Sequence, residues 1–148
     1  MAKNSIRSPF SPPVIKAFIE NIDNIISSSS IVLSSNIQKH FSPDGKTLYL
    51  RGSLLFLDSS VLEIAVFIIE THDGLTIGKY RFHYMNPHER ILFRYDNAPH
   101  HPDIASHPHH KHVPNHVIPS RGPSLKVARL HLLKLSPSFS SISNQKVP

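Results

Sequence analysis

Apolar residues near the start of the chain recur at three- and four-residue spacing, which predicts one amphipathic helix from Pro13. The apolar positions are Val14, Ile15, Phe18, Ile19, Ile22, Ile25 and Ile26. Ser11 suits the N-cap, because Pro12 and Pro13 can occupy a first turn in which the missing N–H does no harm. The serine run 27–30 ends the pattern. We expect disorder in the polar, Pro-rich residues 1–12.

The middle of the chain predicts strands, because apolar runs of strand length are separated by turn residues. The predicted strands cover residues 47–57, 61–71, 75–85 and 90–95. Asp73-Gly74 between the second and third is a hairpin signal. Residues 31–41 fit either a short strand or another helical turn. Strands joined by short turns form an antiparallel meander, and the N-terminal helix is the obvious cover for its apolar face.

After Asp96 the alternation stops, and proline and histidine dominate. We expect an irregular loop through residue 112, followed by a short edge segment over residues 113–119. Pro114 and Pro119 exclude that segment from a central strand, because proline has no N–H for the ladder.

The last part of the chain predicts a second helix over residues 124–135 and a disordered, Ser-rich tail over residues 136–148. The fold class that follows is α+β, a single domain over residues 13–135. It contains an antiparallel meander of four or five strands, an N-terminal helix, a C-terminal helix and a His-rich loop.

Composition excludes several kinds of site. The chain of 148 residues contains no Cys, so disulfides, zinc–thiolate sites and thiol nucleophiles are ruled out. No apolar run reaches the ~18–20 residues that a membrane span needs. The basic N-terminal residues are not followed by the apolar segment of a secretory signal. We expect a cytoplasmic protein that makes no contact with a membrane.

Charge is unevenly distributed along the chain. Residues 1–103 contain ten basic and ten acidic residues, so the formal net charge of +6 lies entirely in residues 104–148. A basic segment suits nucleic acid or an acidic protein partner. It is equally typical of a solvated tail.

Seven of the twelve histidines fall between His100 and His116, and three interpretations compete for them. The first is a divalent metal site, because imidazole is a common ligand and a pair such as His109 and His112 can chelate. Asp96 or Asp103 could complete such a site. Against it, a Pro-interrupted loop sets no fixed ligand geometry.

The second interpretation is acid–base chemistry on a phosphodiester. Metal-free cleavage of RNA needs a base for the ribose 2′-hydroxyl, an acid for the leaving oxygen and a cation for the charge on phosphorus. Histidine together with Arg or Lys provides all three near neutral pH. The third interpretation is structural: histidine side chains hold a long polar loop on the sheet by hydrogen bonds.

Three segments carry a resemblance to a known family. They are residues 80–84 (Tyr-Arg-Phe-His-Tyr), 93–102 (Phe-Arg-Tyr-Asp-Asn-Ala-Pro-His-His-Pro) and 108–112 (Pro-His-His-Lys-His). With Leu50-Arg51-Gly52, they resemble the TumE-like family of small prokaryotic proteins. Members of that family are toxins of type II toxin–antitoxin systems. The resemblance therefore implies a toxin with a cognate antitoxin partner, often of helix-turn-helix type.

From the residues and the resemblance together, we predict a toxin that acts on RNA by ribonuclease-like acid–base chemistry. The candidate catalytic residues are His100, His101, His109, His110, His112 and Asp96, with Asp96 orienting a histidine. The candidate phosphate-binding residues are Arg81, Arg94 and Lys111. This hypothesis needs no cofactor. The alternative is a metal-binding or non-catalytic protein-interaction domain that uses the same loop, with a divalent metal at the histidines.

Overall fold

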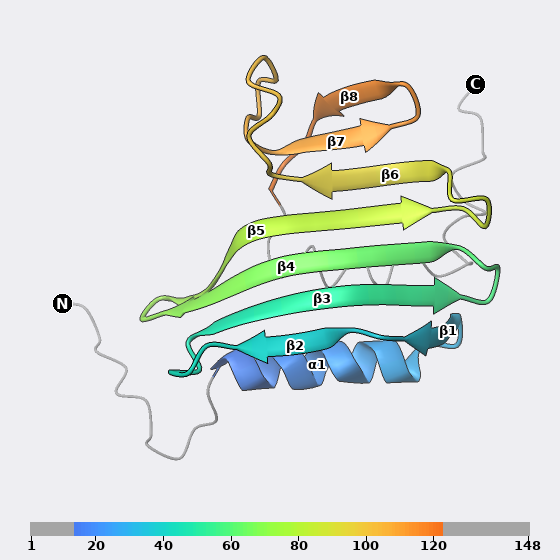
Figure 1. Ribbon diagram of the computed structural model, residues 1–148. Helices are drawn as coiled ribbons and strands as arrows, with labels where there is room; N and C mark the ends of the chain where they lie inside the picture. The colour runs from blue at the N-terminus through green and yellow to red at the C-terminus, as the bar shows by residue number, and fades with distance from the viewer. Residues whose placement is uncertain (1–13, 123–148) are drawn as a thin grey trace, which may run out of the picture.

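The computed structural model describes residues 14–122, which form one helix and eight strands (Figure 1). The elements are α1 (Val14–Ser28), β1 (Val32–Ser35), β2 (Gln38–Phe41), β3 (Thr47–Phe56), β4 (Val61–Thr71), β5 (Gly74–Met85), β6 (Ile91–Asp96), β7 (His110–Val113) and β8 (His116–Pro119). The strands form one antiparallel sheet in the order β1-β3-β4-β5-β6-β7-β8, and β2 also pairs with β3. The predicted helix over residues 124–135 and both predicted disordered ends lie outside the described residues.

The sheet is larger than the sequence predicts, and the expectation of four or five strands was wrong. The ambiguous residues 31–41 contain β1 and β2, and the last three residues of the predicted His-rich loop, 110–112, belong to β7. β8 lies at the edge of the sheet, as Pro119 requires. Within the described residues there is one helix, so the α+β class holds only in part: this is mainly an antiparallel sheet covered by a helix.

β1 and β2 pair with the two halves of the same strand, β3, and Gly52 lies where they separate. A Cβ atom on Gly52 would lie 2.6 Å from Cα of Ile37 and 2.7 Å from the carbonyl oxygen of Asn36. The side chain of Asn36 accepts a hydrogen bond of 2.6 Å from the N–H of Ser53. The segment between β1 and β2 therefore passes so close to β3 that position 52 needs a residue without a side chain. The φ of +152° at Gly52 also favours glycine.

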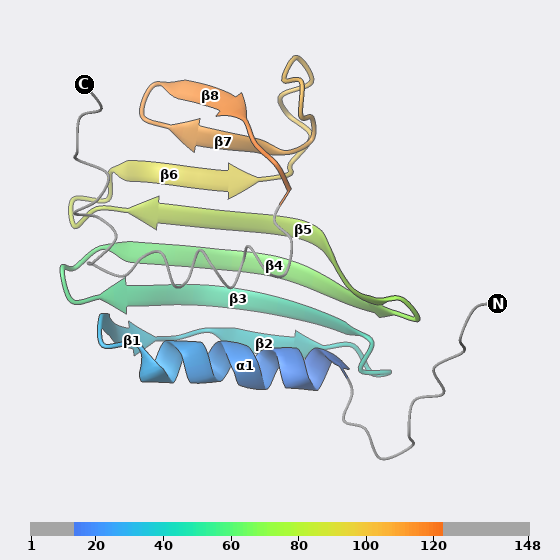
Figure 2. The same cartoon turned by 180° about the vertical axis from the view of Figure 1, so that it is seen from behind.

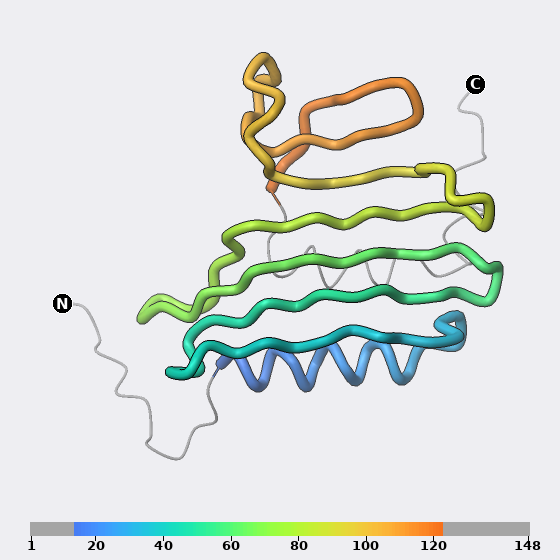
Figure 3. Tube along the Cα trace, viewed as in Figure 1, coloured from blue at the N-terminus to red at the C-terminus, as the bar shows by residue number. Residues whose placement is uncertain are grey.

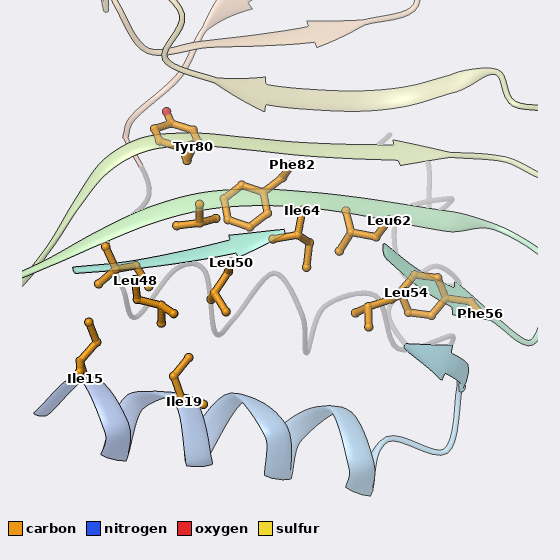
Figure 4. Close-up of a cluster of buried hydrophobic side chains, with 12 residues drawn as sticks. Ile15, Ile19, Leu48, Leu50, Leu54, Phe56, Leu62, Ile64, Tyr80 and Phe82 are labelled. Atoms are coloured by element: carbon orange, nitrogen blue, oxygen red, sulfur yellow. The ribbon is translucent and has the colours of Figure 1, made fainter. Parts of the chain in front are cut away.

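The core lies between α1 and one face of β3, β4 and β5 (Figure 4). Ile15 and Ile19 of α1 point toward Leu48 and Leu50 of β3. Fully burying one such side chain stabilises the fold by about 1.5–3 kcal/mol. Both cartoon views place α1 against the β1–β2 end of the sheet (Figures 1 and 2).

The buried positions alternate along the central strands, as in β4, where Leu62, Ile64, Val66 and Ile68 are buried. Side chains at the intervening positions therefore lie on the opposite face of the sheet. The segment between β6 and β7 leaves the sheet at one end and returns beside β6 (Figure 3). Among residues 14–122 there is no helix with the length and hydropathy of a membrane span.

Candidate functional site

Strand register brings most of the predicted site residues onto the face opposite the core. Residues directly across a ladder point to the same face of a sheet. Arg81 of β5 is opposite Asp96 of β6, and Asp96 is opposite His110 of β7. Arg94, two residues before Asp96, is opposite His112. Three adjacent strands thus place two arginines, one carboxylate and two histidines side by side.

Four of the predicted histidines meet at this point, and we refer to His100, His101, His110 and His112 as the His cluster. One ring nitrogen from each lies within 4.8 Å of those from the other three. The ring centroids are 4.3 Å apart for His100 and His101, and 4.9 Å apart for His110 and His112. β7 supplies the last two, and the segment after β6 supplies the first two.

Asp96 is the buried carboxylate of the site, only 4% exposed. Nε of Arg94 donates to its Oδ2 at 3.0 Å, and the backbone N–H of Ala98 donates to its Oδ1 at 3.1 Å. The same Oδ1 lies 2.9 Å from Nε2 of His110, and Oδ2 lies 3.6 Å from Nε2 of His112. Asp96 is therefore beside two histidines of the cluster.

His110 is 1% exposed and its two ring nitrogens differ in their partners. Nδ1 is 2.9 Å from the carbonyl oxygen of Pro108. Because a carbonyl only accepts, Nδ1 carries a proton and donates it. Nε2 has no hydrogen-bond partner among the described residues, although Oδ1 of Asp96 lies 2.9 Å away. A buried nitrogen of this kind is uncommon.

Desolvation and neighbouring groups lower the pKa values of two further histidines of the cluster, His101 and His112. Partial burial, followed by the guanidinium of Arg94, lowers the pKa of His112 to about 4. Nη2 of Arg94 donates to Nε2 of His112 at 2.8 Å. Desolvation, followed by the imidazoles of His100 and His110, lowers the pKa of His101. Neutral imidazoles have a lone pair that can take a proton or bind a metal.

Two predicted site residues lie away from the His cluster. Lys111 is opposite Tyr95, so it points to the other face, where its Nζ is 4.9 Å from the centre of the Tyr95 ring. His109 stacks on Tyr80, a core residue, and its Nδ1 is 2.9 Å from the Tyr80 hydroxyl. The structural interpretation therefore suits His109, and we leave both residues out of the proposed site.

A groove of about 1000 Å³ runs across the open face of the sheet and reaches the His cluster at His100. Its lining includes Tyr49, Arg51, Phe67, Lys79, Arg81, Arg94, Asp96 and His100. Tyr49, Phe67 and Lys79 are not among the predicted site residues. Alternation in the strands places these residues on the open face, but only the sheet order shows that β3 and β4 extend the face on which the histidines lie.

A family model described as Toxin TumE matches residues 22–135. The match covers most of the chain and includes every strand of the sheet. The chain belongs to the TumE toxin family. This membership confirms the predicted resemblance and indicates a toxin role, for which an antitoxin is the expected partner. Searches of the curated proteins and of the solved structures gave no match for this TumE-family chain.

Proposed function

We propose that this TumE-family toxin acts on RNA in the cytoplasm and cleaves it where the groove meets the His cluster. One observation supports this above the others: a groove lined by four cationic side chains leads to four clustered histidines, and His100 belongs to both. The only carboxylate among the lining residues is the buried Asp96. Such a surface attracts the phosphates of a nucleic acid.

Single-stranded RNA suits the groove better than a duplex. Tyr49 and Phe67 provide aromatic rings on which unpaired bases can stack, and the cations beside them can hold the backbone. Arg81 is half-exposed, and its guanidinium is 3.8 Å from the carboxylate of Glu63. An exposed pair of this kind contributes little to stability, so Arg81 can exchange Glu63 for a phosphate.

Cleavage would begin with the 2′-oxygen of the ribose attacking phosphorus as the bond from phosphorus to the 5′-oxygen breaks. The 2′-hydroxyl proton passes to a base, and the leaving 5′-oxygen takes a proton from an acid. These oxygens lie on opposite sides of phosphorus. Two groups within hydrogen-bond reach of them are therefore more than about 6 Å apart.

The His cluster is more compact than that spacing, since one ring nitrogen from each histidine lies within 4.8 Å of those from the other three. These particular nitrogens are therefore too close together to flank one phosphate as an acid–base pair. In our proposal a histidine of the cluster takes the 2′-hydroxyl proton, and water gives a proton to the leaving 5′-oxygen. Arg81 and Arg94 stabilise the charge that develops on phosphorus.

The test uses the purified full chain, a single-stranded RNA and a DNA of the same sequence. We expect the RNA to be cut and the DNA to stay intact, because only RNA has the 2′-hydroxyl. The variant Arg51→Ala/Arg81→Ala removes two groove cations and should weaken RNA binding at least about 10-fold. Lys46→Ala/Arg90→Ala removes the same charge from exposed positions outside the groove lining, and should change binding less than about 3-fold.

A folded chain that arrests bacterial growth but neither binds nor cuts RNA would show that the toxin has another target. Equal weakening in both double variants would show that net charge, rather than the groove, attracts RNA. We also propose that a small antitoxin of helix-turn-helix type relieves the growth arrest. Co-expression of the neighbouring gene tests this part separately.

A further inference from the structure

We propose that the His cluster binds one divalent transition-metal ion, and that Zn²⁺ is the ion its chemistry suits best. The proposal concerns metal binding alone and holds whether or not the toxin acts on RNA. It rests on the arrangement of His100, His101, His110 and His112 and on the unpartnered nitrogen of His110.

The spacing of the four histidines is close to that of a ligand set. Zinc lies about 2.0–2.1 Å from each nitrogen in a tetrahedral site, which puts the nitrogens roughly 3.3 Å from one another. In the His cluster the corresponding atoms lie within 4.8 Å of one another. The widest gap therefore closes by about 1.5 Å on binding, a movement within reach of side-chain rotation.

The hydrogen bond on the far side of His110 is the second, independent observation. Its Nδ1 donates to the carbonyl of Pro108, so Nε2 is the ring nitrogen that is left to act as a ligand. A ligand histidine is commonly held in this way, with its other N–H on a carbonyl or a carboxylate. Nε2 is buried without a hydrogen-bond partner among the described residues, and a metal ion would satisfy it.

Two of the ligands are fixed by the sheet, and two can adjust. His110 and His112 alternate on β7, which is paired on both sides, so their backbone positions are set. His100 and His101 lie outside the strands, and His100 is exposed beside the groove. A metal ion can therefore enter from the groove side and draw these two histidines toward the fixed pair.

Neighbouring charges bear on the affinity in opposite directions. The carboxylate of Asp96, beside His110, offsets part of the charge of a dication. Arg94 opposes binding, because it donates to Nε2 of His112 and must release that nitrogen before it can act as a ligand. We therefore assign His100, His101 and His110 as the primary ligands and His112 as the fourth.

The ligand type selects the metal. Four imidazoles favour Zn²⁺, Co²⁺, Ni²⁺ or Cu²⁺, whereas Mg²⁺ and Ca²⁺ prefer oxygen ligands. Tetrahedral nitrogen coordination is typical of zinc. Co²⁺ can replace zinc as a probe, because its visible absorption reports the coordination geometry.

The experiment titrates Zn²⁺ by calorimetry, and Co²⁺ by visible absorption, into the metal-free full chain prepared without a histidine tag. We expect one equivalent to bind and the cobalt spectrum to be tetrahedral. His100→Ala/His101→Ala should weaken binding at least about 100-fold. His72→Ala/His88→Ala, which removes two exposed histidines that are not members of the cluster, should bind like the parent chain.

Absence of zinc and cobalt binding at tens of micromolar would overturn the proposal, as would unchanged affinity in His100→Ala/His101→Ala. Circular dichroism of each metal-free variant establishes that it is folded, and the two altered positions lie outside the strands. RNA cleavage is measured on the same samples. Metal binding without cleavage would reject only the proposed function, and cleavage by the metal-free chain without metal binding would reject only the metal site.

Discussion

Asp96 and His110 are paired across β6 and β7, and Oδ1 of Asp96 lies 2.9 Å from Nε2 of His110. Both side chains are almost completely buried. Burying a charge is costly unless it is paired, and Arg94 provides the pairing cation for Asp96. The site is therefore built around one carboxylate that the sheet encloses.

Asp96→Asn should destabilise the fold markedly. The amide keeps nearly the same shape but loses the negative charge that Arg94 pairs with. Removing one partner of a buried ion pair costs about 3 kcal/mol in the free energy of unfolding. Denaturant unfolding measures the loss, with Asp73→Asn as the control, because the Asp73 side chain is 82% exposed. Equal stability of Asp96→Asn and the parent chain would contradict the role given to the carboxylate.

Titration of Tyr80 should lower the stability of the protein as the pH rises above about 10. Burial, followed by the charge of Asp96, raises the pKa of Tyr80 from 10.0 to about 12. The unfolded chain therefore loses this proton at lower pH than the folded chain. The contribution of protonated Tyr80 to the free energy of unfolding is complete below pH 10 and is lost as pH rises toward about 12. Unfolding curves at pH 9, 10, 11 and about 12 should fall less steeply for Tyr80→Phe than for the parent chain. Parallel curves would show that Tyr80 does not titrate in this range.

His109→Ala should lower stability and leave RNA cleavage nearly unchanged. His109 packs on Tyr80 and shares a hydrogen bond with its hydroxyl, and it lies outside the His cluster. Loss of one such hydrogen bond costs about 1 kcal/mol. Cleavage assays well below the melting temperature separate the two effects, with His100→Ala as the comparison that should lose activity. A loss of cleavage in His109→Ala equal to that in His100→Ala would return His109 to the candidate catalytic residues.

Gly52→Ala should be far more harmful than Gly45→Ala. Both glycines have positive φ, so alanine is strained at either position by about 1–2 kcal/mol. Only at Gly52 does the new methyl group collide with backbone, at 2.6 Å from Cα of Ile37, whereas Gly45 has open space. We expect Gly52→Ala to lower the free energy of unfolding by about 3 kcal/mol or more. Similar losses in both variants would show that strain alone sets the cost.

Local pattern predicted the long elements well. The helix from residue 14 and the strand over residues 61–71 have the predicted positions, because a full apolar face or a clear alternation specifies each one. The Asp73-Gly74 hairpin also forms where predicted, joining β4 and β5. In these segments the residues that decide the structure are neighbours in the sequence.

The short strands were not predictable in the same way. β2 is Gln-Lys-His-Phe and β7 is His-Lys-His-Val, and neither has an apolar alternation. Each forms because an adjacent strand offers unpaired backbone groups, β3 for the first and β6 for the second. Such strands are specified by their neighbours in the sheet, which the local sequence does not show.

The chemistry available to this toxin follows from its residues alone: many histidines close together, arginines nearby, one aspartate at the end of a predicted strand and no cysteine. Which of these residues act together depends on the fold. Alternation along β7 sends His110 and His112 to the face of Asp96 and sends Lys111 to the opposite face. The reason is geometric: successive side chains of a strand point to opposite faces, so the register between strands decides which residues meet.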